Sequence, residues 1–167
     1  MRSGRRVTPG TPSTGPSAYD RALRMLARRE YSNRELHTRL TQLGHAEAEV
    51  AAALARLETA HYQDDQRFAE MLLRSRIAQG YGPLRLHAEL KNHGFADARI
   101  RELLDAAEVD WDACAVAQLL RRYGTGSPSD RAARVRRAQF LLRRGFAAAT
   151  VRAATQADVG PSADPES

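Results

Sequence analysis

The sequence of 167 residues contains one cysteine, and aromatic residues make up only 6% of it. A single cysteine excludes a disulfide within the chain and a thiolate metal cluster. We expect Cys114, which lies between Ala113 and Ala115 in an apolar helical run, to be a small buried thiol. No apolar run approaches the length of about 20 residues that crosses a bilayer, and the N-terminus lacks the apolar core of a secretion signal. These absences predict a cytoplasmic protein that does not bind a membrane.

The patterns of common catalytic and metal sites are also missing. No histidine has a second histidine or a cysteine three or four residues away, the spacing that makes a metal pair on a helix. We expect Glu35 and Glu89 to cap helices or pair with nearby arginines rather than to act as acid and base. The segment Gly80-Tyr81-Gly82-Pro83 is rich in glycine, but its proline has no N–H to offer a phosphate, so it fits a connection between helices. The sequence therefore predicts a protein that is not an enzyme and that uses no cofactor and no metal.

What the chain does contain is a repeat of about 50 residues. Three glycines, Gly44, Gly94 and Gly145, each end a helix-like stretch and lie 50 and 51 residues apart. Around each glycine the same residue types recur: a leucine four positions before it, a ring one position after it and a β-branched residue six positions after it. These residues are Leu40, Leu90 and Leu141, then His45, Phe95 and Phe146, then Val50, Ile100 and Val151. Eight positions before the glycines stand Leu36, Leu86 and Arg137.

The fold class follows from this repeat and from the composition. Good helix formers dominate, and no segment alternates in the way that a strand does. A helical repeat of this length cannot bury its apolar face alone, so that copies stack on their neighbours. We predict an all-α protein of three tandem three-helix repeats that form an elongated array. The expected divisions are residues 18–61, 62–109 and 110–155, between disordered tails at 1–17 and 156–167, of which the second is acidic.

Capping residues predict where individual helices begin. Ser32 is expected to cap the second helix, with Glu35 at the capping-box position, and Pro83 fits the first turn of the helix that follows it. Asp97 and Asp110 are expected to cap two later helices. The first helix is expected to span residues 19–29. The apolar faces of the second helices in the first and third repeats are expected to consist of Leu36, Leu40 and Leu43, and of Val135, Ala138 and Leu142.

The positive charge is concentrated in the third repeat. Residues 110–155 contain nine arginines and three aspartates, a net charge of +6, whereas residues 18–61 carry +1 (seven basic, six acidic) and residues 62–109 carry −1 (seven basic, eight acidic). The guanidinium group pairs bidentately with phosphate or with carboxylate, so such a cluster suits nucleic acids and acidic protein surfaces alike. The alternative is a solvated helix face whose arginine stems lie along apolar surface.

Several short motifs stand out along the chain. They are Arg28-Arg29, Ser32-Asn33-Arg34-Glu35-Leu36, Tyr62-Gln63-Asp64-Asp65, Phe68-Ala69-Glu70, Gly80-Tyr81-Gly82-Pro83, Asp110-Trp111 and Phe140-Leu141-Leu142-Arg143-Arg144-Gly145-Phe146. In their order and spacing these motifs resemble the RecX family of bacterial regulatory proteins, which modulate the RecA recombinase. The likeness runs from Tyr19 to Val151, and Gln63 and His45 depart from the usual pattern. The resemblance implies a curved chain of three-helix units that binds along the RecA–DNA filament and inhibits or modulates recombination and the SOS response to DNA damage.

With this resemblance, we expect eight arginines to contact the RecA filament or DNA phosphate. They are Arg74, Arg76, Arg121, Arg122, Arg136, Arg137, Arg143 and Arg144. The main alternative is a direct DNA-binding module of the helix-turn-helix type, because a three-helix unit can present a recognition helix. A third possibility is a passive scaffold with an arginine-rich face.

Overall fold

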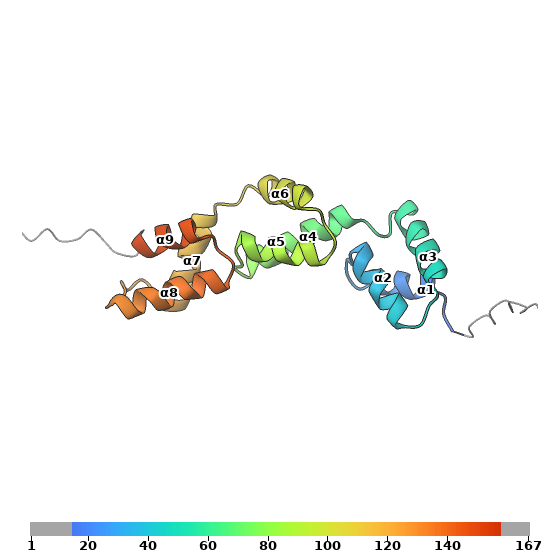
Figure 1. Cartoon of the computed structure of the whole chain (residues 1–167), viewed down its shortest axis with the longest axis horizontal. Coiled ribbons are helices and arrows are strands. Elements are labelled where there is room, and N and C mark those ends of the chain that lie inside the picture. The colour runs from blue at the N-terminus through green and yellow to red at the C-terminus, as the bar shows by residue number, and fades with distance from the viewer. Residues whose placement is uncertain (1–14, 158–167) are drawn as a thin grey trace, which may run out of the picture. The chain divides into compact units, whose positions relative to one another are not determined.

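The computed structural model describes residues 15–157, and in this range it contains nine α-helices and no strand (Figure 1). The helices follow one another in three sets of three, which confirms an all-α fold of three tandem three-helix repeats. Most of both predicted tails lies outside the described residues. Repeat 1 consists of α1 (Ala18–Leu26), α2 (Asn33–Gln42) and α3 (Glu47–Thr59), repeat 2 of α4 (Asp65–Ala78), α5 (Pro83–Asn92) and α6 (Asp97–Ala106), and repeat 3 of α7 (Trp111–Tyr123), α8 (Arg131–Arg143) and α9 (Ala148–Ala157).

The repeats belong to two compact units. The first unit ends at Asp64 and contains repeat 1, and the second begins at Asp65 and contains repeats 2 and 3. None of the helices in the described part of the chain has the length and apolar character of a membrane span.

The three glycines close the second helix of each repeat as the sequence predicts. Gly44, Gly94 and Gly145 have φ values of 87°, 93° and 86°, in the left-handed region where a glycine avoids the steric cost of a Cβ. The amide of the residue after each glycine donates to the carbonyl of the leucine in the repeat pattern, which closes a Schellman motif. Each turn sends the chain into the third helix, whose β-branched residue is buried.

The caps agree with prediction at two of three sites. Ser32 accepts a hydrogen bond from the amide of Glu35, and Asp110 accepts one from the amide of Ala113. The prediction for Asp97 is wrong, because Ala96 occupies the N-cap position and the carboxylate of Asp97 accepts a hydrogen bond from Lys91 Nζ at 2.8 Å instead. The first helix ends at Leu26, three residues before the predicted end.

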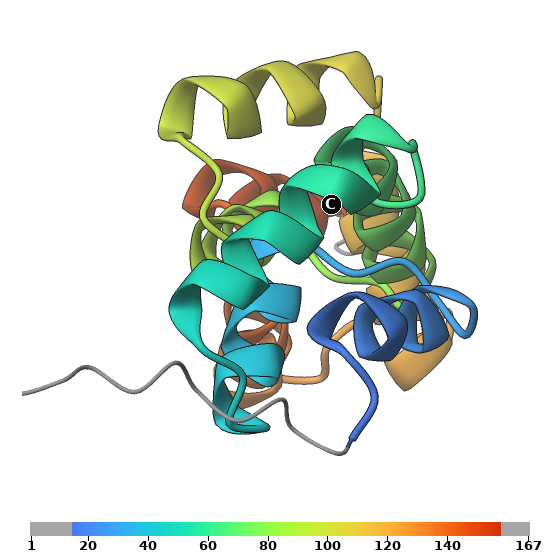
Figure 2. The same cartoon turned by 90° about the vertical axis from the view of Figure 1, so that its right-hand side faces the viewer.

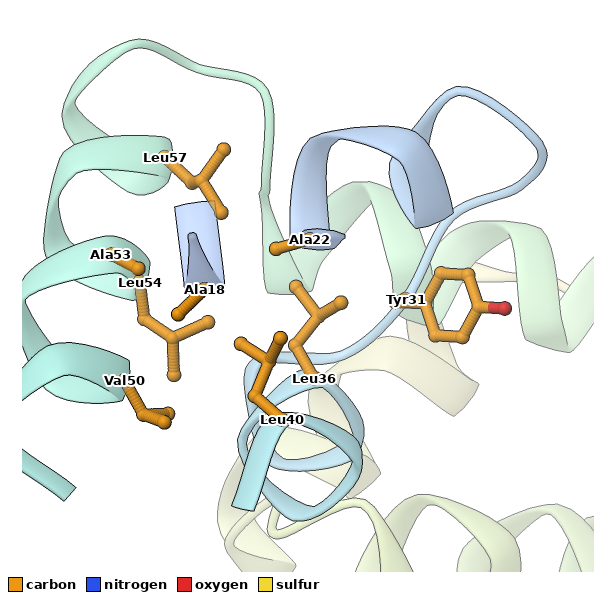
Figure 3. Close-up of a cluster of buried hydrophobic side chains, with 9 residues drawn as sticks. All are labelled: Ala18, Ala22, Tyr31, Leu36, Leu40, Val50, Ala53, Leu54 and Leu57. Carbon is orange, nitrogen blue, oxygen red and sulfur yellow. The ribbon is translucent and has the colours of Figure 1, made fainter. Parts of the chain in front are cut away.

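The core of repeat 1 forms where α1, α2 and α3 meet. Figure 2 shows α1 and α2 lying on one side of α3. Figure 3 shows the apolar side chains that fill this space, with alanines from α1 facing leucines from α2 and α3. They are Ala18, Ala22, Tyr31, Leu36, Leu40, Val50, Ala53, Leu54 and Leu57. The prediction that Leu43 belongs to this apolar face is wrong, since its side chain is 54% exposed.

In repeat 3 the buried face of α8 differs from the predicted one. Val135 and Leu142 are 45% and 50% exposed, whereas Arg137, Phe140 and Leu141 are buried. The Gly145 turn places Leu141 in the slot of the repeat leucine, and its neighbour Leu142, about 100° further round the helix, therefore points away from the core. The apolar periodicity of Val135 and Leu142 misleads because the turn, rather than the number of apolar residues, sets the rotation of the helix.

Repeats 2 and 3 join through main-chain hydrogen bonds. The amide of Gly82 donates to the carbonyl of Arg144 at 2.8 Å, and the amide of Leu84 donates to the carbonyl of Gly145 at 3.0 Å. The α4–α5 loop thus lies beside the α8–α9 turn (Figure 1). Gly82 is buried, and a Cβ on it would come within 2.5 Å of the main chain of Gly145 and Phe146. We call these contacts the repeat 2–3 junction.

Replacing Gly82 with alanine is therefore expected to destabilise the second unit by about 1–3 kcal/mol, as overpacking does in a tight interior. Gly126 provides a matched control, because a Cβ there would meet nothing within 4 Å and the residue is exposed. We expect the Gly126→Ala change to alter the free energy of unfolding by less than about 0.5 kcal/mol. Urea denaturation followed by circular dichroism measures both. Equal stability of the Gly82→Ala and Gly126→Ala proteins would show that the junction is not closely packed.

Candidate partner-binding surface

All eight arginines predicted to bind a partner lie in the second unit, but their surroundings differ. Arg76 and Arg144 are half-buried, and Arg137 is only 7% exposed. The exposed members of the set are Arg74, Arg121, Arg122, Arg136 and Arg143. The prediction that these residues contact a partner stays a prediction, and the contacts below separate those that are available from those already engaged.

Three of the arginines surround one pocket in repeat 3. A cavity of about 360 Å³ lies between α7 and α8. It is lined by Gln118, Arg121 and Arg122 of α7, by Phe140 of α8 and by Arg144, the C-cap of α8. The guanidinium carbons of Arg122 and Arg144 each lie 5.0 Å from the centroid of the Phe140 ring. The two groups are therefore no further apart than twice this distance. We call this cavity the arginine pocket.

Arg144 contributes both to the pocket and to the repeat 2–3 junction. Its Nη1 donates to the carbonyl of Gln79 at 2.8 Å and to that of Gly80 at 3.1 Å, while its own carbonyl accepts the bond from Gly82. Its guanidinium carbon lies 5.4 Å from the centroid of the Tyr81 ring. Nη1 is therefore engaged within the protein, whereas no hydrogen bond engages Nε or Nη2 among the described residues.

Arg76 is neutralised inside repeat 2. Its Nε donates to Glu89 Oε2 at 2.6 Å, and Glu89 Oε1 accepts a second bond from Arg85 at 3.2 Å. Repeat 1 has a similar arrangement, in which Arg29 and Arg39 both pair with Glu35. The expectation that Glu35 and Glu89 pair with arginines is confirmed.

The electrostatics of Glu35 show the effect of such pairing. Partial burial would raise the pKa of the Glu35 carboxyl, but the hydrogen bonds and charges of Arg29 and Arg39 outweigh it and hold the pKa below its ordinary value. The carboxylate therefore stays ionised and balances the arginines beside it.

Repeat 3 lacks the acidic residues at the corresponding positions. Phe140 stands where repeat 2 has Glu89, and Ala148 stands where repeats 1 and 2 have Glu47 and Asp97. Asp110 and Asp130 accept hydrogen bonds as N-caps of α7 and α8. Within residues 15–157, no ion pair or hydrogen bond engages the side chains of Arg121, Arg134, Arg136 and Arg143. The positive charge of this repeat is therefore largely uncompensated.

Arg74 lies away from the arginine pocket. It lines a groove of about 270 Å³ between α4 and α6, whose apolar wall includes Leu73, Ile77 and Leu103. Its exposed guanidinium is available to an acidic group, but nothing in the described residues joins it to the cluster in repeat 3. The eight arginines thus divide into one cluster around α7 and α8 and two separate residues on α4.

Arg137 occupies the leucine slot of the repeat. Leu36 and Leu86, at the same position in repeats 1 and 2, are buried. Arg137 Nη2 donates to the carbonyl of Gly126 at 2.6 Å, and its guanidinium carbon lies 5.1 Å from the centroid of the Tyr123 ring. These contacts tie the long α7–α8 loop to the helices and indicate a structural role.

Two histidines of repeat 1 form local pairs with glutamates. His37 Nε2 lies 2.6 Å from Glu47 Oε1, and His45 lies over its turn with Nδ1 3.1 Å from Glu49 Oε2. Cys114 is half-buried, less than we expected, and burial raises the pKa of its thiol. No group of three metal-ligating side chains occurs among residues 15–157.

Two members of the arginine pocket, Gln118 and Phe140, are missing from the predicted set. Gln118 fits because Gly80 has no side chain: a Cβ at Gly80 would overlap the amide of Gln118. The sequence feature that could have indicated the pocket is Phe140, which stands among the arginines of repeat 3 at the position that Glu89 has in repeat 2.

Comparisons with known proteins agree with the repeat assignment. Models of the first, second and third three-helix domains of RecX match residues 18–57, 64–104 and 108–155. The chain is 49% identical over 138 residues to a regulatory protein RecX of Halorhodospira halophila, covering 83% of this chain and 86% of that protein. A regulatory protein RecX of Stenotrophomonas maltophilia is 44% identical over 138 residues, covering 83% and 85%.

A solved structure has the same fold. The crystal structure of RecX from Lactobacillus salivarius superposes with a TM-score of 0.69 and 22% identity, covering 84% of this chain and 93% of that one. At this level of identity the likeness concerns the fold alone.

Arg136 and Arg137 are neighbours in the sequence, and comparing them tests whether the buried arginine stabilises the fold more than the exposed one. Replacing Arg137 with alanine is expected to lower the free energy of unfolding by about 1–3 kcal/mol, because a buried hydrogen bond and the packing of its stem are lost. Replacing the exposed Arg136 with alanine should change it by less than about 0.5 kcal/mol. Thermal unfolding of the two proteins measures the difference. Similar stabilities would mean that Arg137 does not hold the α7–α8 loop.

Proposed function

The chain belongs to the RecX family of regulatory proteins, and from this membership we propose that it binds the RecA recombinase and the RecA–DNA filament. In this proposal it inhibits or modulates recombinase and co-protease activity during DNA repair and the SOS response, in the cytoplasm and without catalysing a reaction. A non-catalytic binder changes the behaviour of a filament only by binding one of its states more tightly than another. The binding surface must therefore make more favourable contacts with one state of the filament than with the other.

The uncompensated arginines of repeat 3 are the observation that best supports this proposal. Arg121, Arg136 and Arg143 are exposed and have no acidic partner in the described part of the chain. Removing water from these guanidinium groups costs free energy, and only anionic groups of a partner can offset this cost. Such groups are the carboxylates of an acidic protein surface or the phosphates of DNA. The junction with repeat 2 keeps these side chains on one compact unit, so that they reach a partner together.

We assign less of the binding to Arg76, Arg137 and Arg144. Each already makes internal hydrogen bonds, and releasing them for a partner would remove part of the stability of repeat 2, the α7–α8 loop or the junction. Exposed arginines therefore provide the cleaner tests of partner binding.

Reversing the charges of Arg121 and Arg143 together to glutamate should weaken binding to RecA filaments at least about tenfold, or ~1.4 kcal/mol. Co-sedimentation with filaments formed on single-stranded DNA with a slowly hydrolysed ATP analogue measures the affinity, and circular dichroism checks that helicity is unchanged. Arg24→Glu, an exposed arginine of repeat 1, is the matched control and should bind as the unaltered protein does.

The same proteins should differ in their effect on RecA. The unaltered chain is expected to slow strand exchange and co-protease activity, and the doubly reversed chain should do so only at higher concentration. Unchanged RecA activity at a saturating concentration of the unaltered chain would remove the proposal.

Direct binding to DNA remains the alternative outcome of this test. A module that reads naked duplex should bind it as well as it binds the filament, and its log affinity should fall with log salt concentration with a slope of about −0.9 per phosphate contacted. A regulator of the filament should instead prefer the filament to bare DNA at a fixed salt concentration.

A further inference from the structure

The arginine pocket differs from the rest of the basic surface because three arginines line the same open hollow. Arg121, Arg122 and Arg144 line it, and none of the residues that line it has a carboxylate. Like charges held this close repel one another, and the repulsion is relieved when an anion lies between them. A cavity of about 360 Å³ falls within the range of small-ligand sites, about 300–1,000 Å³.

We propose that the arginine pocket is a phosphate-binding site and that a bound phosphate strengthens the repeat 2–3 junction. This inference names the ligand chemistry of one part of the proposed binding surface. The phosphate site itself does not depend on RecA binding, but its role in regulation rests on the proposed function. The phosphate could belong to a free nucleotide or to the backbone of a nucleic acid, since both offer the same charged oxygens.

Arginine side chains are suited to this task, and those of the pocket are partly pre-positioned. A guanidinium group presents five N–H donors in a plane that matches two phosphate oxygens at once. The buried ring of Phe140 holds the guanidinium groups of Arg122 and Arg144 by cation–π contacts. Because these side chains are already ordered, less conformational entropy is lost when a ligand binds.

Arg144 connects the ligand with the junction. Its Nη1 donates to the carbonyls of Gln79 and Gly80, which leaves the N–H groups of Nε and Nη2 for an anion in the pocket. A phosphate that binds those groups fixes the guanidinium in the position where it also binds the α4–α5 loop. If the phosphate binds more tightly when the junction is closed, then the bound phosphate stabilises the closed junction by an equal free energy, because the two equilibria are linked.

Gln118 forms a second connection between pocket and junction. Its side-chain amide packs against Gly80 in the space where any other residue would have a side chain. The α4–α5 loop is therefore in contact with the wall of the pocket at Gln118 and at Arg144, and opening of the junction would deform the site on both sides.

Inorganic pyrophosphate is the probe for the test, and RecA is absent from it. Titration calorimetry of the full chain should show saturable binding that Arg122→Gln weakens about tenfold, the loss expected for one charge-assisted hydrogen-bonding partner. Arg134→Gln is the matched control, because Arg134 is an exposed arginine of the same repeat that does not line the pocket. Equal weakening by the two changes, or binding no tighter than that of sulfate at equal ionic strength, would overturn the proposal.

Hydrogen exchange tests the connection to the junction. Saturating pyrophosphate should slow exchange of the amides of Gly82 and Leu84, which bond to repeat 3, several-fold in the unaltered chain and in Arg134→Gln. In Arg144→Gln this protection should be lost even at pyrophosphate concentrations that restore occupancy. Protection that persists in Arg144→Gln would disprove the role of Arg144 as the link.

The two sources of phosphate are separated by comparing thymidine monophosphate with a thymidine oligonucleotide at equal phosphate concentration. Tighter binding of the oligonucleotide that Arg122→Gln weakens would assign the pocket to a nucleic acid backbone, and equal affinities would assign it to a free nucleotide. Either result supports a phosphate site, and weakening of neither ligand by Arg122→Gln counts against it. If the unaltered chain binds pyrophosphate but does not bind RecA filaments in co-sedimentation, the result contradicts the proposed function and leaves the phosphate site supported.

Discussion

The second unit depends on the close main-chain contact between the α4–α5 loop and the α8–α9 turn. Gly82 and Gly145 bring the two backbones together because neither has a side chain to hold them apart, and a Cβ on Gly145 would come within 2.6 Å of Arg85. The glycines of the repeat thus have two tasks. They allow the left-handed turn within each repeat, and the absence of a side chain at Gly145 also lets repeat 2 approach closely. A contact made by backbone hydrogen bonds has fixed geometry, so it fixes the side chains that flank it.

The basic character of repeat 3 arises by removal of acids as much as by addition of arginines. Repeats 1 and 2 also contain many arginines, but Glu35, Glu89 and Asp97 pair with basic groups there. Repeat 3 keeps the helices and the turn while it has Phe140 and Ala148 at the positions of acids. An aromatic ring in place of a carboxylate still holds the neighbouring guanidinium groups, yet leaves their charge available to a partner. The same scaffold therefore has several arginines paired internally in repeats 1 and 2 and carries largely uncompensated arginines in repeat 3.

Much of the fold could be predicted from the sequence, because the glycines, the following rings and the β-branched residues recur at fixed spacing and each has one structural reason. The helix faces were harder to predict. Val135 and Leu142 look like an apolar stripe, and only the orientation set by the Gly145 turn shows that they lie outside. The sequence predicts the candidate surface as a cluster of arginines. It does not predict which of these arginines are exposed and which make contacts within the protein. Whether an arginine faces solvent, as Arg136 does, or fills a leucine slot, as Arg137 does, depends on rotation about one helix by a single residue.

Arg144 shows why a cluster of like charges can be both structural and functional. Its backbone accepts the bond from Gly82, its guanidinium reaches the carbonyls of Gln79 and Gly80, and the same group faces the arginine pocket. A lysine could not fill this place, because its compact ammonium cannot spread donors across a plane toward two carbonyls and an anion. In the proposed phosphate site, the guanidinium group of Arg144 therefore connects binding at the pocket with the stability of the junction. Through such a connection, an anion that binds the pocket more tightly when the junction is closed also stabilises the closed junction.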